Sequence, residues 1–233
     1  MNKESVNKKL VEFWDNAFLM SKEDKEELDN LKEQDYKELA PSKKLYEAVA
    51  SLKDCNKVLD YGCGSAWGAI IASKEGAKIV TAVDLGENII NRVNLYKDKF
   101  RADIHAFSIE EDWLNTVENE AYEAIICSNV LDVLPLETSE YILKEFSRII
   151  KKGGRLVIGL NYFLSKEKAK ERNLNLEEDK YLYLDGVLRL TSLSDNQWIS
   201  LFNKNNLDVE SLDYFAWPRE TKETRRLFIL RKK

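Results

Sequence analysis

The stretch from Val58 to Gly68 constrains the fold more than any other part of this chain. Its sequence is Val-Leu-Asp-Tyr-Gly-Cys-Gly-Ser-Ala-Trp-Gly, an apolar run carrying an acid that breaks into glycines and then into a helix-like segment. Glycine is needed where the backbone takes a positive φ or passes close to a ligand. In an open α/β sheet, ligands bind outside the carboxyl ends of the strands. We therefore interpret the stretch as a buried strand followed by a ligand-binding turn at Gly62 and Gly64.

A second apolar strand follows this turn and also ends in an acid. Residues 79–84 have the sequence Ile-Val-Thr-Ala-Val-Asp, which places Asp84 about twenty residues after the glycines, the spacing of a ribose-binding acid. The two carboxylate oxygens of such an acid can accept hydrogen bonds from the 2′ and 3′ hydroxyls together. The two strands therefore predict a ligand that contains adenosine.

Two kinds of adenosine-containing ligand are considered at this turn. Dinucleotide sites use GxGxxG, in which the third glycine lets the helix pack on the strand and meet a pyrophosphate. Here Trp67 stands at the third position, and Gly68 comes one residue late. The sequence therefore disfavours a pyrophosphate, and an NAD(P)-dependent oxidoreductase is kept as the alternative function.

Four segments resemble the motifs of class I S-adenosylmethionine-dependent methyltransferases, in the same order. Asp60-Tyr61-Gly62-Cys63-Gly64 resembles the DxGxG turn of that family, and Asp84 stands where its ribose-binding acid stands. Residues 122–131 are similar to its fourth strand and following loop, and residues 146–158 to its helix, paired glycines and fifth strand. The resemblance covers residues 45–160 and implies methyl transfer from S-adenosylmethionine. A non-catalytic S-adenosylmethionine-binding module is a further alternative.

The resemblance also implies which residues bind the cofactor. Asp60 is expected to support the methionyl ammonium and Asp84 the ribose, while Leu85 and Ile109 would form apolar walls for the adenine. Ser108 stands where many relatives have an acid for the adenine amino group. The complete expected set is Asp60, Gly62, Cys63, Gly64, Trp67, Asp84, Leu85, Ser108, Ile109 and Asn129.

The expected methyl acceptor is a small molecule. Residues 128–131, Ser-Asn-Val-Leu, lack the Asn/Asp-Pro-Pro-aromatic motif of enzymes that methylate nucleic-acid amines, and the net charge of -5 disfavours a phosphate backbone as partner. The acceptor pocket is expected under the N-terminal helix and residues 161–190, with Trp14, Tyr162 and Tyr183 as candidate substrate contacts. No catalytic base is assigned, because orientation of an activated methyl group can by itself lower the barrier by about 7–11 kcal/mol.

Composition sets further bounds. The three cysteines and the single histidine lack metal-ligand spacing, so no metal is expected. The N-terminus lacks the apolar region of a signal peptide, and no apolar run approaches the roughly 20 residues of a membrane span. We expect a cytoplasmic protein without a membrane partner, and the oligomeric state stays open.

Strand and helix patterns alternate along the middle of the chain, which is typical of a doubly wound parallel sheet. The expected elements are residues 57–61, 65–75, 78–84, 86–98, 103–108, 111–117, 122–128, 137–151 and 155–161. Residues 207–217 and 225–231 resemble the antiparallel hairpin that ends the family's sheet. The predicted fold class is therefore α/β, a doubly wound, mostly parallel seven-stranded sheet with a C-terminal antiparallel hairpin and an N-terminal helical cap.

The chain is expected to form a single domain, since its 233 residues fit the usual size range. Val6, Leu10, Phe13 and Ala17 recur at helical spacing, with Trp14 at the edge of this apolar face. An Asp-Gly pair between two apolar runs, within residues 181–190, predicts a tight hairpin. The expected parts are an N-terminal helical cap (1–42), a cofactor-binding core (43–160), an insertion or lid (161–193) and a C-terminal helix and strand pair (194–233).

Overall fold

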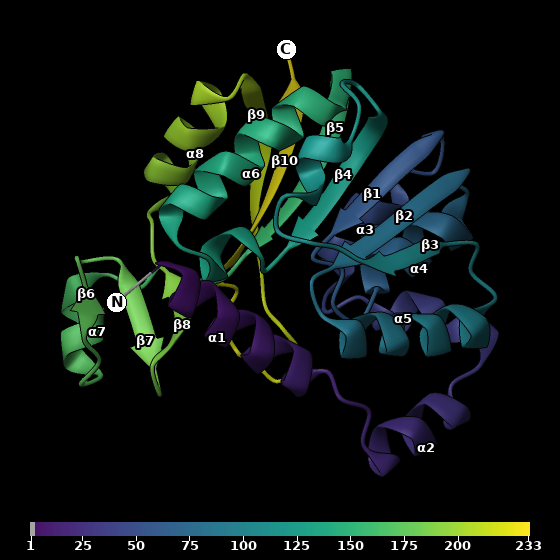
Figure 1. Ribbon diagram of the computed structural model, residues 1–233, viewed down its shortest axis with the longest axis horizontal. Coiled ribbons are helices and arrows are strands. Elements are labelled where there is room, and N and C mark those ends of the chain that lie inside the picture. Colours follow the sequence, from purple (N-terminus) through teal and green to yellow (C-terminus); the bar gives the residue numbers. More distant parts are fainter. Residues whose placement is uncertain (1–2) are drawn as a thin grey trace.

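The computed structural model describes the backbone of residues 3–233 and the side chains of residues 8–233. Its centre is a seven-stranded sheet with the strand order β3-β2-β1-β4-β5-β10-β9 (Figure 1). The strands are β1 (Lys57–Tyr61), β2 (Ile79–Asp84), β3 (His105–Ser108), β4 (Tyr122–Ser128), β5 (Ile150–Leu160), β9 (Leu207–Phe215) and β10 (Arg225–Lys232). Strands β1 to β5 pair in parallel, whereas β10 is antiparallel to both β5 and β9. The predicted fold class and C-terminal hairpin are thus confirmed.

Helices cover both faces of this sheet (Figure 1). One face carries α3 (Lys43–Ala50), α4 (Trp67–Glu75) and α5 (Glu87–Phe100), and the other carries α6 (Leu136–Ile149) and α8 (Asp195–Lys204). Leu45, Ile70 and Val93 belong to the apolar core on the first face, and Phe146 and Trp198 to the core on the second. The helix expected over residues 111–117 is only a short 3₁₀ turn, η2 (Trp113–Thr116).

The strand order places a crevice at the centre of the sheet. The chain proceeds outward from β1 to β3 and then returns to β4 on the other side of β1. Connections that leave β1 and β4 therefore diverge, and this is the point at which ligands bind in open α/β sheets.

The N-terminal segment lies near the carboxyl ends of the central strands. It consists of α1 (Lys3–Ala17), α2 (Lys22–Asn30) and the 3₁₀ helix η1 (Glu33–Leu39). In Figure 1, α1 is the purple helix beside the end of β4. Its Leu10 is buried, as the amphipathic pattern predicted. Val6, which the same pattern placed on this face, lies outside the described side chains.

Residues between β5 and α8 form a small separate sheet. It has the order β6-β7-β8, from β6 (Leu176–Glu177), β7 (Tyr181–Leu184) and β8 (Val187–Thr191), and it follows α7 (Lys166–Glu171). The hairpin predicted at Asp185 and Gly186 is confirmed, since both residues take a positive φ, 53° and 73°, as a type I′ turn requires. Strand β8 packs against α1 and against the 3₁₀ turn η3 (Leu131–Val133). None of the helices within residues 3–233 has the length and apolar character needed to cross a membrane.

Candidate functional site

A cavity of about 830 Å³ lies at the carboxyl ends of β1, β2 and β4. Its size falls in the range of pockets that enclose small ligands. Seven stretches of chain form it, namely α1, the end of η1, the turn after β1, the segment after β2, the segment after β3, the loop after β4 with the start of α6, and residues 217–218. Side chains from the whole length of the protein therefore meet at the crevice that the topology creates.

The turn after β1 presents bare backbone to this cavity. Gly62 and Gly64 both have positive φ, 66° and 50°. A Cβ atom at Gly62 would lie 2.3 Å from Cγ2 of Val130, and one at Gly64 would lie 3.1 Å from Cζ of Phe18. The N–H groups of Gly62 and Cys63 both donate to the Val83 carbonyl, which ties the turn to β2. Glycine is thus required here for both conformation and space.

Asp60 closes the floor of the site at the end of β1. Its side chain is only 4% exposed, and its Oδ2 accepts a hydrogen bond of 2.8 Å from the Ala69 N–H in the first turn of α4. A Cβ at Gly68 would lie 3.0 Å from the same oxygen, so this glycine permits the close approach of α4. Burial raises the pKa of Asp60 to about 8, although the hydrogen bond from Ala69 by itself lowers this pKa. A cation bound beside Asp60 would favour its ionised form.

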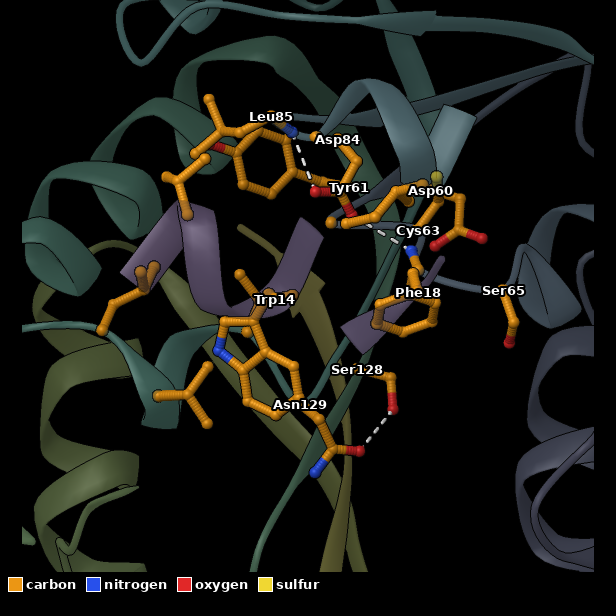
Figure 2. Close-up of a pocket in the computed structure, with 18 of the residues that line it drawn as sticks. Trp14, Phe18, Asp60, Tyr61, Cys63, Ser65, Asp84, Leu85, Ser128 and Asn129 are labelled. Carbon is orange, nitrogen blue, oxygen red and sulfur yellow. Dashed lines mark hydrogen bonds between the residues drawn. The ribbon is translucent and has the colours of Figure 1, made fainter. Parts of the chain in front are cut away.

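Asp84 is held in place by the backbone on both sides. Its Oδ2 accepts from the Gly64 N–H at 3.1 Å, and its Oδ1 accepts from the Leu85 N–H at 2.8 Å (Figure 2). Burial raises the pKa of this carboxyl group as well. Each carboxylate oxygen has a further lone pair. Asp84 therefore keeps acceptor capacity for a ligand in the cavity.

The structure brings together nine of the ten residues expected at the cofactor. They are Asp60, Gly62, Cys63, Gly64, Trp67, Asp84, Leu85, Ile109 and Asn129, all of which line the cavity. Ser108 does not, because it is exposed at the end of β3, where it pairs with Asp84. Successive residues of a strand point to opposite sides. The next residue, Ile109, is buried and lines the cavity, as do Glu111 and Asp112.

Helix α1 forms one wall of the cavity and is fastened to the N-terminus of α5. Its Leu10, Val11 and Trp14, and Phe18 just beyond its end, line the cavity. Asp15 accepts hydrogen bonds from the backbone N–H of Asn88 at 2.9 Å and from the Asn88 side chain at 2.7 Å.

Asp15 is a helix cap supplied from a distant part of the chain. Its Oδ1 also lies 3.3 Å from the Ile89 nitrogen, and a Cβ atom at Gly86 would come within 2.2 Å of that oxygen. Gly86, the N-cap residue directly before α5, offers no side-chain cap of its own. A glycine at the N-cap position is the one sign in the sequence that another residue must cap α5. The sequence does not show that this residue is Asp15.

Two of the three expected substrate contacts are corrected by the structure. Trp14 lines the cavity, but Tyr162 and Tyr183 do not, and no residue of 161–193 belongs to the described lining. Tyr162 packs against the small apolar cluster of the inserted sheet, and the ring of Tyr183 lies against that of Tyr181. Since the inserted sheet packs on the outside of α1 and on η3, it supports the wall of the cavity without reaching its interior.

Two buried N–H donors in the cavity have no partner. The indole Nε1 of Trp14 and the amide Nδ2 of Asn129 are both inaccessible, and neither makes a hydrogen bond within the described part of the chain. Asn129 has a φ of 58°, its N–H donates to the Gly159 carbonyl, and its Oδ1 accepts from Ser128 Oγ (Figure 2). Buried polar groups are nearly always satisfied in native proteins.

The cavity geometry agrees with what comparison with known proteins finds. Residues 58–154 match a family model described as a methyltransferase domain. These residues carry β1, the glycine turn, Asp84 and β4, around which the cavity is built. This match and the fold around it support a class I S-adenosylmethionine-dependent methyltransferase. The NAD(P) alternative receives no support from this match.

Several known methyltransferases resemble this chain. A ribosomal protein L11 methyltransferase of Campylobacter lari is 30% identical over 127 residues, which cover 53% of this chain and 42% of the relative. The chain spans about half or less of the length of the first curated relatives that it matches. Among solved structures, a Burkholderia thailandensis 1,6-didemethyltoxoflavin-N1-methyltransferase with bound S-adenosylhomocysteine matches with a TM-score of 0.62 and 11% identity, covering 81% of this chain and 78% of that one. Magnesium protoporphyrin IX methyltransferase from Synechocystis PCC 6803 matches with a TM-score of 0.61 and 13% identity, covering 82% and 83%.

The cavity suits S-adenosylmethionine, the cofactor of class I methyltransferase domains. The side-chain-free turn at Gly62 and Gly64 leaves room for a ligand against the backbone. Asp84 offers two oriented acceptors for ribose hydroxyls, and Leu85 and Ile109 offer apolar surface beside them. Asp60 offers a carboxyl group for the methionyl ammonium, and Asn129 also lines the cavity. The residues present therefore fit this group.

Proposed function

We propose that the protein transfers the methyl group of S-adenosylmethionine to a small-molecule acceptor without the help of a metal ion. The observation that carries the proposal is the extent of the cavity. Its lining continues past the glycine turn and Asp84 to Val130, Val133 and Leu134 and to the apolar side chains of α1. A cavity of about 830 Å³ that reaches beyond the cofactor-binding residues has room for a second small ligand.

The proposed reaction depends mainly on aligning the acceptor atom with the methyl group of the cofactor. When bound, the cofactor supplies a methyl group activated on a sulfonium, which a lone pair of the acceptor displaces. Asp84 holds the ribose, the glycine turn lets the ligand lie against the backbone, and α1 keeps water away from the reacting atoms. Positioning of this kind is worth up to about 7–11 kcal/mol of barrier lowering. A side chain that removes a proton is required only if the acceptor atom arrives protonated.

A protein substrate is the competing possibility, because the curated relatives are named as ribosomal protein L11 methyltransferases. The match to them is partial, covering 42% of the Campylobacter lari protein. The wall that α1 forms over the cavity favours a small acceptor, since a protein segment would have to pass this helix.

The test offers both substrates to the same enzyme preparation. The protein is incubated with methyl-labelled S-adenosylmethionine and either a protein-free metabolite extract or purified ribosomal protein L11. We expect label in the small-molecule fraction together with S-adenosylhomocysteine, and no label with the Asp84→Ala variant. Label in L11 would contradict the small-molecule proposal. Cofactor binding by calorimetry without transfer to either substrate would favour the non-catalytic binding module.

A further inference from the structure

We propose that Trp217 recognises the methyl acceptor by stacking its indole against a planar, conjugated ring of that molecule. The inference rests on the proposed function, because it assigns a substrate contact within the same cavity. It goes further by naming the chemical class of the acceptor, which is an aromatic or heteroaromatic ring, and the residue that selects it.

Trp217 is an accessible aromatic side chain at the cavity. It follows β9, lines the cavity together with Pro218, and is 38% exposed. The core tryptophan Trp198, by contrast, is fully buried. Aromatic side chains contribute most to binding when their large surface is covered. A ligand in the cavity can therefore cover indole surface that the protein itself leaves open.

One face of this indole is already occupied. The guanidinium of Arg225, at the start of β10, lies 3.7 Å from the centroid of the Trp217 ring. Arg225 does not belong to the described lining of the cavity, whereas Trp217 does. The indole therefore lies between the guanidinium and the cavity, and its other face is the one that a ligand meets. A flat ring covers such a face best, because aromatic rings stack with an offset at centroid distances of about 4.5–7 Å.

Glu220 fixes the position of the indole. Its carboxylate accepts hydrogen bonds from the buried Arg225 guanidinium at 2.7 and 2.9 Å and from the Trp217 backbone N–H at 2.8 Å. A contact surface that is ordered before binding loses little freedom when the ligand arrives, which favours affinity. Since Glu220 also neutralises the guanidinium, the ring rather than the charge behind it is what a ligand contacts.

A chain of hydrogen bonds links Trp217 to a second wall of the cavity. Arg225 donates to Oδ1 of Asn161, the residue after β5, and the Asn161 backbone N–H donates to Oδ2 of the buried Asp132. Asp132 belongs to η3, whose Val133 lines the cavity. One connected network thus holds the indole and this aliphatic wall in fixed positions relative to each other.

The strand order separates Trp217 from the residues that we assign to the cofactor. Trp217 lies in the connection between β9 and β10, whereas the glycine turn follows β1 and Asp84 ends β2 (Figure 1). Strands β4 and β5 lie between β1 and β10 in the sheet. Trp217 therefore reaches the cavity from the side opposite to the ribose acid, where the acceptor rather than the adenosine would meet it.

The experiment uses a matched pair of probes on the whole chain saturated with S-adenosylhomocysteine, which keeps the probes out of the adenine site. One probe is a fluorinated naphthamide, which is flat and aromatic. The other is the fully saturated counterpart, a fluorinated decalin carboxamide, which is puckered and at least as apolar. Fluorine NMR measures their affinities for the wild type, Trp217→Leu, Trp217→Phe and Tyr214→Leu. The last variant is the matched control, because Tyr214 is a similarly exposed aromatic residue of β9 outside the cavity lining.

We expect the aromatic probe to bind the wild type and Tyr214→Leu about threefold to tenfold more tightly than the saturated probe, the size of one aromatic stacking contact. In Trp217→Leu this preference should fall to within about twofold, and Trp217→Phe should keep a larger preference because it retains an aromatic face. In nitrogen–proton NMR spectra, the indole signal that is missing from Trp217→Leu should shift more with the aromatic probe than with the saturated one.

The proposal is overturned if the aromatic probe has no advantage, if its advantage survives in Trp217→Leu, or if Trp217→Phe keeps no more of it than Trp217→Leu. It is equally overturned if Tyr214→Leu loses as much of the advantage, or if neither probe binds at millimolar concentration. A loss of about tenfold in S-adenosylhomocysteine affinity in Trp217→Leu also overturns it, because the indole would then serve the cofactor. Failure of the proposed function has a different signature, namely no binding of S-adenosylhomocysteine to the wild type, or methyl label in ribosomal protein L11.

Discussion

The two halves of the cavity are built in different ways. In the cofactor half, around Gly62, Gly64 and Asp84, the carboxylate and the backbone N–H groups satisfy one another before any ligand arrives. In the acceptor half, where α1 faces the loop after β4, the lining consists mainly of apolar side chains such as Val11, Val133 and Leu134. The first half is preorganised by its own hydrogen bonds. The second is assembled by packing between distant segments, so the two halves should respond differently to mutation.

The largest loss of cofactor affinity is expected from replacing Asp84. Replacing it with alanine removes two charge-assisted hydrogen bonds to ribose, each worth roughly 1.5–3 kcal/mol, and frees the N–H groups of Gly64 and Leu85. We expect the affinity for S-adenosylhomocysteine to fall by about a hundredfold or more in calorimetry. Thermal unfolding serves as the control for an intact fold. Binding within threefold of the wild type would show that the cofactor half does not depend on this carboxylate.

A smaller effect, set by pH, is expected at Asp60. Its pKa of about 8 in the free protein should fall when a cationic ligand binds beside it, so binding below pH 8 releases a proton. Affinity for S-adenosylhomocysteine should then rise with pH, by at most about tenfold per unit, and level off above pH 8. Calorimetry in buffers of different ionisation enthalpy measures the proton directly. Asp60→Asn should abolish the release attributed to this residue, and an unchanged proton count in that variant would contradict the assignment.

The same residue makes the stability of the free protein depend on pH. The folded-state pKa of Asp60 is raised from 3.8 to about 8, so the folded protein holds a proton that the unfolded chain loses. Its contribution is therefore fully present below about pH 4 and is lost as the pH rises through about 8. Asp60→Asn should flatten the decline in melting temperature over this window. A decline of unchanged slope would mean that other groups cause it.

Removing the contact that fastens α1 to α5 is expected to cost about 1 kcal/mol of stability. Asp15→Ala removes the side-chain cap of the α5 N-terminus, and such caps contribute about 0.5–2 kcal/mol. Hydrogen exchange of residues 8–18 should become faster, and cofactor affinity should fall no more than roughly fivefold. Asp24→Ala is the matched control, since Asp24 caps α2 and pairs with Arg92 outside the cavity lining. Equal effects of both variants on affinity would argue against a role of α1 as the wall.

The smallest effect on cofactor affinity and methyl transfer is expected from a substitution outside the cavity. Tyr183 lies on β7 with its ring against Tyr181 and does not belong to the cavity lining. Tyr183→Phe should leave both cofactor affinity and methyl transfer within about twofold of the wild type, as is usual for surface changes of about ±0.5 kcal/mol. A tenfold loss would place the inserted sheet in the acceptor half after all.

The cofactor half could be predicted from the sequence because its signals are local. A strand that breaks into Gly62 and Gly64, and a second strand that ends in Asp84, are short patterns whose meaning depends on backbone conformation and strand direction. Parallel pairing brings the carboxyl ends of neighbouring strands together whatever the rest of the chain does. Ser108 is the one expected residue outside the cavity lining, because neighbouring residues of a strand point to opposite sides and Ile109 takes the inward position.

The acceptor half depended on contacts between distant segments. Amphipathic spacing predicted α1, but only the folded chain shows that Asp15 caps a helix that begins more than seventy residues later, and that Trp14 rather than Tyr162 or Tyr183 reaches the cavity. Local pattern thus determined the sheet, the glycine turn and the ribose acid, since each follows from the conformational preferences of a few consecutive residues. Tertiary packing decided which aromatic side chains line the cavity. Every aromatic side chain is stabilised by burial, and the periodicity of the sequence does not show which residues it will be buried against.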